Sequence, residues 1–285
     1  MASTDKARQV GSGLGWSLTS SLAMRLGNVA LSMVVARLIA PEAFGVFAVA
    51  LTVWTILGAL SEFGLGSDLV RAADPERRAP TVATMGMVLG VGAAVTMALA
   101  APALASAFRS PESAPVVQVM ALALALFGLT IVPAAALQRA YRQRTLFVVN
   151  GTGLLVSAAT IVTLALLDRG PMALAWGQVA AQASVVVGLH LATHTRPRFG
   201  FDAEVARESL AFCLPLAMAN LVSWLLITLD NLVVSRELSP EALGLYVLAF
   251  NVSSWPMSAV GQAVRVVALP AFADTASVEE RNRGL

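Results

Sequence analysis

Long stretches without a charged side chain are the feature that most limits how this chain can fold. Seven of them occur, at residues 43–61, 79–108, 113–138, 145–167, 170–195, 209–229 and 242–264. One membrane crossing needs roughly 20 mainly apolar residues. An eighth stretch, 16–40, is apolar apart from Arg25 and Arg37. The pattern therefore predicts an all-α polytopic membrane protein with about eight transmembrane helices.

Composition agrees with a membrane protein. The chain is 57% hydrophobic and 13% charged, whereas a soluble domain has about a quarter charged residues. The net charge is only +2, and no basic patch is interleaved with aromatic residues, so nucleic acid is not an expected partner. A single cysteine, Cys213, excludes an internal disulfide and a cysteine-based metal site.

The basic residues predict the orientation. With a cytoplasmic N-terminus, the segments on the inside, which include 71–78, 139–144 and 196–207, hold 13 Lys and Arg residues. The outside turns hold three, Arg109, Arg169 and Arg236. Cytoplasmic loops collect Lys and Arg, so we expect an even number of crossings with the N-terminus inside.

An internal repeat predicts the domain organisation. Residues 36–47 return as 235–246, with Arg37 matching Arg236 and Gly45 matching Gly244. Each copy joins two apolar stretches, and six crossings separate the copies, so they share one orientation as parallel repeats. We expect a six-helix lobe over residues 1–200. Residues 201–285 would then be the first two helices of a second lobe that is incomplete in this chain.

Polar residues inside membrane helices indicate which faces point away from lipid. On the first helix they fall at i, i+4, i+7 and i+11, a single stripe. The seventh and eighth helices carry comparable polar faces. The residues predicted to line a substrate cavity are Ser21, Arg25, Asn28, Asn220, Asp230, Asn251 and Gln262.

Arg25 is the most informative of these residues. It lies about 13 Å into the first helix, where a charge costs roughly 2.5–3.5 kcal/mol on insertion scales. Its guanidinium group suits phosphate oxygens, so it is a candidate contact for a diphosphate. The alternative is a structural ion pair with Asp230 or Glu62.

Other polar residues are interpreted as structural. Asp68 is expected at a solvated helix end, and Gln178 and Gln182 are expected to pack between helices. His190 and His194 share a face but have no accompanying acidic or cysteine ligand, so no metal site is predicted. No phosphate-binding loop, dinucleotide fingerprint or catalytic constellation is present. We therefore predict neither a cofactor nor an enzymatic activity.

The turn segment and the residues that follow it resemble a known family. The pattern Ala-Arg-x-x-x-Pro-Glu-x-Phe-Gly at 36–45, followed by Phe63-Gly64-Leu65, is similar to the start of polysaccharide and oligosaccharide flippases. Gly244-Leu245-Tyr246 and Ala268-Leu269-Pro270 resemble the seventh and eighth helices of that family. These are the O-antigen and exopolysaccharide exporters of the superfamily that includes multidrug extruders and lipid II flippases.

The resemblance implies two six-helix lobes around a cavity. It also implies alternating access that moves an undecaprenyl-diphosphate-linked oligosaccharide to the periplasmic leaflet of a bacterial inner membrane, for lipopolysaccharide or exopolysaccharide biosynthesis. Membrane lipids, a polysaccharide polymerase and chain-length machinery are the implied partners. The chain departs from the family in having eight helices where twelve to fourteen are usual. Two alternatives stay open: a cation-coupled multidrug exporter, and a non-transporting membrane scaffold of polysaccharide assembly.

Overall fold

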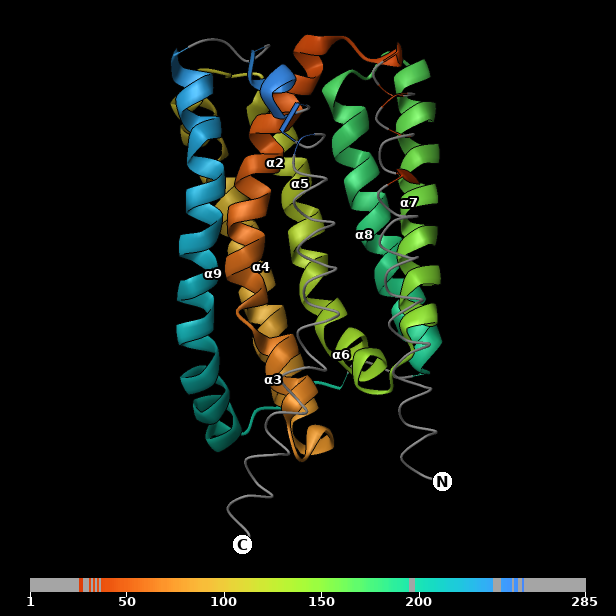
Figure 1. Cartoon of the computed structure of the whole chain (residues 1–285), viewed down its shortest axis with the longest axis vertical. Coiled ribbons are helices and arrows are strands. Elements are labelled where there is room, and N and C mark those ends of the chain that lie inside the picture. Colours follow the sequence, from red (N-terminus) through yellow and green to blue (C-terminus); the bar gives the residue numbers. More distant parts are fainter. Residues whose placement is uncertain are drawn as a thin grey trace, which may run out of the picture.

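The structure is a bundle of long helices (Figure 1). It is a computed structural model that describes residues 26, 27, 31, 33, 35, 37–194, 198–237, 242–247, 249, 250 and 253. The elements are α2 (Pro41–Glu62), α3 (Leu65–Arg71), α4 (Pro75–Ala107), α5 (Ser113–Phe127), the 3-10 turn η1 (Gly128–Thr130), α6 (Ile131–Arg139), α7 (Gln143–Leu166), α8 (Pro171–Thr193) and α9 (Ala203–Glu237).

Five helical stretches in the described residues are long and apolar enough to cross a membrane. They are Pro41–Gly58, Pro75–Ala107, Ser113–Arg139, Gln143–Leu166 and Pro171–Thr193. Each coincides with a charge-free stretch of the sequence, so the prediction of an all-α polytopic membrane protein is confirmed. The predicted span 209–229 lies within α9. The predicted helices 16–40 and 242–264 fall mostly outside the described residues.

Proline and glycine determine where several helices begin and end. Proline is the first residue of α2, α4 and α8, a position where its missing N–H and fixed φ cost nothing. Phe63 and Gly64 have φ angles of 45° and 72°, and this left-handed pair ends α2 before α3 begins. Gly64 relieves the strain because it has no Cβ.

The predicted helix 113–138 is interrupted near Pro133. It consists of α5, the turn η1 and α6. Pro133, near the start of α6, cannot donate to the carbonyl four residues earlier, and its ring clashes with that carbonyl in a regular helix. The 3-10 turn lies where this conflict would arise.

Glycines let α4 and η1 approach one another closely. A Cβ on Gly128 would lie 2.3 Å from the Gly86 carbonyl oxygen, and a Cβ on Gly90 would lie 3.2 Å from the Leu124 carbonyl oxygen. Gly86 and Gly90 are spaced as in the small-residue motifs that bring membrane helices together. Backbone contact between these elements therefore depends on the absence of side chains.

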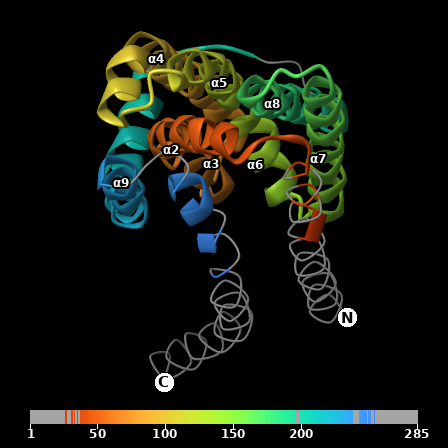
Figure 2. The same ribbon diagram turned by 90° about the horizontal axis from the view of Figure 1, so that it is seen from above.

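The central helix of the bundle is α5. It packs against α2, α4 and α8, while α7 packs mainly against α8. Seen from above, α4, α5 and α8 form one row, α2 lies beside α5, and α9 lies at the edge near α2 (Figure 2). The main core lies where α2, α4 and α5 meet, and Val49, Met97 and Met120 are fully buried there.

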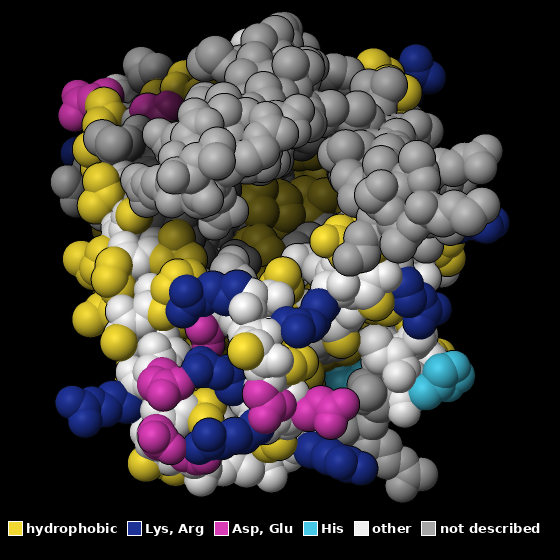
Figure 3. Space-filling model, turned by 60° about the horizontal axis from the view of Figure 1, so that its bottom comes forward, with side chains coloured by type: hydrophobic (Ala, Val, Ile, Leu, Met, Phe, Trp, Pro, Cys, Tyr) yellow, Lys and Arg dark blue, Asp and Glu magenta, His cyan; other side chains and the backbone are white. Residues whose placement is uncertain are grey.

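Charged side chains gather at the lower end of the bundle (Figure 3). Arg139 donates to the Val70 and Ala72 carbonyl oxygens at 3.1 and 2.5 Å, and Arg142 donates to the Ala192 carbonyl oxygen at 3.2 Å. The described parts of the loops predicted to be cytoplasmic thus meet at one end, as an alternating topology requires. Which side of the membrane this end faces stays a prediction.

Asp68 lies at the centre of this charged end. Its side chain is 1% exposed and accepts hydrogen bonds from Arg71 and Arg78 at 3.3 Å and from Ser209 at 2.8 Å. Arg71 also lies 3.4 Å from the centre of the Phe212 ring, a cation–π geometry. The expectation of a solvated Asp68 is therefore wrong, because the side chains of α3, α4 and α9 enclose the carboxylate.

The start of α9 is fixed by a second acidic residue. The carboxylate of Asp202 accepts from the backbone N–H groups of Glu204 and Val205 at 3.0 and 3.3 Å, and it pairs with Arg77 at 3.1 Å. The Val205 N–H and the Arg77 guanidinium lower the pKa of Asp202. These bonds favour the charged form of the cap and attach α9 to the start of α4.

The two copies of the sequence repeat touch one another at the opposite end. A Cβ on Gly244 would lie 3.1 Å from the Gly45 backbone nitrogen and 3.4 Å from its Cα atom. Gly45 and Gly244 are equivalent positions of the repeat. A contact between equivalent residues is what a rotation axis passing between two copies produces, which supports the predicted parallel repeat.

We predict that Gly128→Ala lowers the melting temperature of the purified protein in detergent. The new methyl group would overlap the Gly86 carbonyl, and overpacking of this kind costs about 1–3 kcal/mol. Gly92→Ala is the matched control on α4, because a Cβ there meets no atom within 4 Å. Equal melting temperatures for the two variants would show that the α4–η1 contact is not tight.

We also predict that Asp68→Asn destabilises the protein strongly. Removing the buried charge takes the Asp68 partner from Arg71 and Arg78, of which Arg78 keeps its pair with Glu208. Breaking a buried ion pair in this way costs about 3–5 kcal/mol.

Arg77→Gln is the comparison variant, because its pairs with Asp202 and Glu204 are exposed. Exposed pairs contribute about 0–1 kcal/mol, so we expect a much smaller decrease in its melting temperature. A wild-type melting curve for Asp68→Asn would contradict the structural role of this cluster.

Candidate functional site

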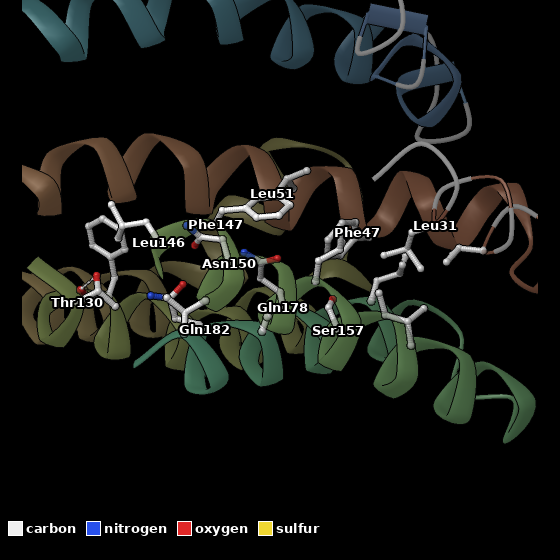
Figure 4. A pocket seen from close by; sticks show the side chains of 18 of the residues that line it. Leu31, Phe47, Leu51, Thr130, Leu146, Phe147, Asn150, Ser157, Gln178 and Gln182 are labelled. Carbon is white, nitrogen blue, oxygen red and sulfur yellow. Dashed lines mark hydrogen bonds between the residues drawn. The ribbon is translucent and has the colours of Figure 1, made fainter. Parts of the chain in front are cut away.

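The described structure contains a cavity of about 820 Å³. It lies between α2 on one side and α7 and α8 on the other, and residues of η1 and α6 line its lower part (Figure 4). Gly244 and Val247 of the second repeat reach its upper part. The cavity therefore lies mostly within the predicted first lobe and touches the second copy of the repeat.

One face of α7 contributes a stripe of polar side chains to this cavity. Gln143, Asn150 and Ser157 all line it and are seven residues apart. Residues at this spacing lie on nearly the same face of a helix. The stripe spans 14 residues, or about 21 Å at 1.5 Å per residue, and so extends over much of the membrane thickness.

The neighbouring helix, α8, adds two more amides. Gln178 and Gln182, one turn apart on α8, line the same cavity, and Asn150 points into the space beside them (Figure 4). Gln138 on α6 contributes another amide at the lower end. The interpretation of Gln178 and Gln182 as contacts between helices does not match their position on the cavity wall.

Aromatic and aliphatic side chains complete the lining. Phe44 and Phe47 come from α2, Phe127 from α5, and Phe147 from α7. No Asp, Glu, Lys, Arg or His is found among the described lining residues. In the part of the chain that the structure describes, the cavity wall therefore combines uncharged amides with aromatic rings.

The amides differ from other polar groups of the bundle in their hydrogen bonding. The hydroxyls of Thr55, Thr84 and Thr96 each donate to the backbone carbonyl four residues earlier. The side-chain amides of Gln138, Gln143, Asn150, Gln178 and Gln182 make no hydrogen bond to any described residue. In a membrane such groups need water or a ligand as partner.

Most of the residues predicted from the sequence to form the site lie outside the described residues. These are Ser21, Arg25, Asn28, Asn251 and Gln262. Asn220 belongs to α9, but its side chain is not among those described. Asp230, also on α9, accepts a hydrogen bond from Tyr246, which links α9 to the second copy of the repeat turn. These assignments stay predictions.

Sequence reasoning missed the stripe on α7 although a signal was present. Gln143, Asn150 and Ser157 recur with a helical period inside an apolar stretch, as the residues of the first helix do. The stripe contains no charged residue, and one of its members is a serine. The sequence alone therefore does not distinguish it from polar residues that occur by chance in membrane helices.

The sequence is similar to proteins of polysaccharide biosynthesis. Succinoglycan biosynthesis transport protein ExoT of Rhizobium meliloti is 28% identical over 99% of this chain and 57% of its own length. Lipopolysaccharide biosynthesis protein WzxC of Escherichia coli is 24% identical over 95% of this chain and 56% of its own length. Teichuronic acid biosynthesis protein TuaB of Bacillus subtilis is 24% identical over 74% of this chain and 44% of its own length.

The chain spans little more than half the length of the first two relatives. No solved structure matches it significantly. The sequence profile of the polysaccharide biosynthesis protein family matches residues 34–283, which includes every complete helix described above. The chain therefore belongs to the polysaccharide biosynthesis protein family.

Proposed function

We propose that this protein moves an undecaprenyl-diphosphate-linked oligosaccharide from the cytoplasmic to the periplasmic leaflet of a bacterial inner membrane. The observation that carries the proposal is a cavity between membrane-spanning helices, lined by amides that make no hydrogen bond to a described residue, in a chain of the polysaccharide biosynthesis family. A hydrophobic solute would leave those amides unsatisfied, whereas the hydroxyls of a sugar both donate and accept. The protein acts as a transporter and not as an enzyme.

Alternating access of two lobes is the proposed mechanism. Residues 1–200 form one lobe, and residues 201–285 begin the second, with the N-terminus in the cytoplasm. The contact between Gly45 and Gly244 supports this division, because it joins equivalent positions of the two repeats. A lobe that rocks about such a contact exposes the cavity to one side at a time.

The proposed anionic contact is Arg25. A diphosphate crossing a low-dielectric membrane needs a cationic partner, and a guanidinium group donates two parallel hydrogen bonds to phosphate oxygens. Ser21 and Asn28 share its helical stripe in the sequence. Asn220, Asp230, Asn251 and Gln262 are proposed to complete the polar faces between the lobes.

The multidrug exporter is the weaker alternative. A cationic drug needs a carboxylate partner, and none is present among the described residues that line the cavity. Asp230, which with Glu62 is a candidate coupling carboxylate in that alternative, accepts a hydrogen bond from Tyr246. The scaffold alternative has no comparable argument, because a scaffold does not require a cavity.

We predict that the whole product of the reading frame, reconstituted in proteoliposomes, transfers a fluorescent undecaprenyl-diphosphate oligosaccharide between leaflets. Arg25→Ala should reduce the initial rate at least about tenfold, because a lost charge-assisted contact is worth about 1.5–3 kcal/mol. Arg25→Lys should restore part of the rate, since it keeps the charge.

The control is Thr152→Val on α7, because Thr152 is exposed and its hydroxyl bonds the Val148 carbonyl. Absence of transfer by the wild-type protein would refute the flippase proposal. A normal rate for a folded Arg25→Ala variant would assign that arginine to structure.

A further inference from the structure

We infer that the cavity between α2, α7 and α8 is a subsite for the uncharged sugar units of the substrate, separate from the contact that holds the diphosphate. This inference rests on the proposed function and deepens it. It is carried by three properties of the described lining: unpaired amides, aromatic rings and the absence of charge.

The amides are positioned to act on one extended ligand. On α7, Gln143, Asn150 and Ser157 form a line, and on the neighbouring helix α8, Gln178 and Gln182 form a second line beside it. Each amide offers two donors and one acceptor oxygen. A ligand lying along the two lines needs alternating donors and acceptors along its length, which is the surface that linked sugar rings present.

The aromatic residues fit the same ligand. Phe44 and Phe47 are one turn apart on α2 and line the cavity opposite α7 and α8, and Phe47 can be followed in Figure 4. A sugar ring has polar edges and an apolar face of C–H groups, and the apolar face packs against an aromatic ring. Phe127 on α5 and Phe147 on α7 add further rings to the lining. The cavity therefore offers amides for the hydroxyl groups of a saccharide and aromatic rings for its C–H face.

The smaller pocket of the structure provides an internal comparison. It has a volume of about 360 Å³ and lies between α2, α4 and α9. Its polar lining residues are Thr52 and Thr96. Thr96 donates to the Gly92 carbonyl oxygen, and Thr52 has a partner as well. The polar groups of that apolar pocket thus have partners within the protein, whereas the amides of the larger cavity make no hydrogen bond to a described residue.

The lack of charge separates this subsite from a phosphate site. A diphosphate in the cavity would have no cationic partner among the described lining residues, and an unpaired buried charge is strongly unfavourable. The same argument disfavours uronic acids and other acidic sugars. The subsite should therefore select neutral glycan units.

The test is binding of lipid-free oligosaccharides to the protein in nanodiscs. A panel of neutral and acidic oligosaccharides released from bacterial surface polysaccharides is presented to three proteins: wild type, the triple variant Asn150→Leu, Gln178→Met and Gln182→Met, and the control Thr152→Val. Wild type and the control should retain neutral members. The triple variant should bind them at least about tenfold more weakly.

Inorganic pyrophosphate is the competitor that separates the two sites, and it should not displace the neutral glycan. Displacement, preferential retention of acidic glycans, unaltered binding by the folded triple variant, or no retention by wild type would each overturn the subsite. Transfer in proteoliposomes is measured in parallel. If wild type transfers lipid-linked glycan while the triple variant transfers it at the normal rate, the subsite fails and the flippase proposal stands.

Discussion

Hydrocarbon offers no hydrogen-bond partner, and this constraint accounts for most of the structure. Backbone groups are satisfied within helices, and the hydroxyls of Thr55, Thr84 and Thr96 are satisfied by carbonyls of their own helix. Among the described residues, charged groups lie toward the ends of the bundle or are enclosed with partners, as Asp68 is. The amides of the cavity differ, because they make no hydrogen bond to a described residue. In a membrane protein, such a departure marks the place where something polar enters.

Helix contacts in this bundle depend on small residues more than on large ones. Gly86, Gly90 and Gly128 allow the backbones of α4 and η1 to touch, and Gly45 and Gly244 do the same between the repeats. Without a hydrophobic driving force between helices, close backbone packing supplies much of the association energy. The two contacts have different roles. The α4–η1 contact holds helices together within the predicted first lobe, whereas the Gly45–Gly244 contact lies where two moving lobes would meet.

The sequence was sufficient to predict the fold class, because the length of a stretch without charged residues can be counted along the chain. The described helices α2, α4, α7 and α8 match the predicted stretches within a few residues. The burial of Asp68 was not predicted, because it depends on neighbours distant in sequence. Ser209, which bonds Asp68, is 141 positions away. The tertiary partner of a polar residue cannot be deduced from local pattern.

The candidate site shows the same limit in a more specific form. Arg25 stood out because a central charge is costly, whereas Gln178 and Gln182 appeared ordinary because amides between membrane helices usually bond each other. These amides are unusual because they have no hydrogen-bond partner among the described residues. That depends on the cavity beside them, which the sequence does not reveal. A charged residue at the middle of a membrane helix is costly, and an arginine there suits the anionic part of a substrate. Unpaired neutral amides favour hydroxyls, so a lipid-linked glycan would meet two kinds of site, each suited to one part of it.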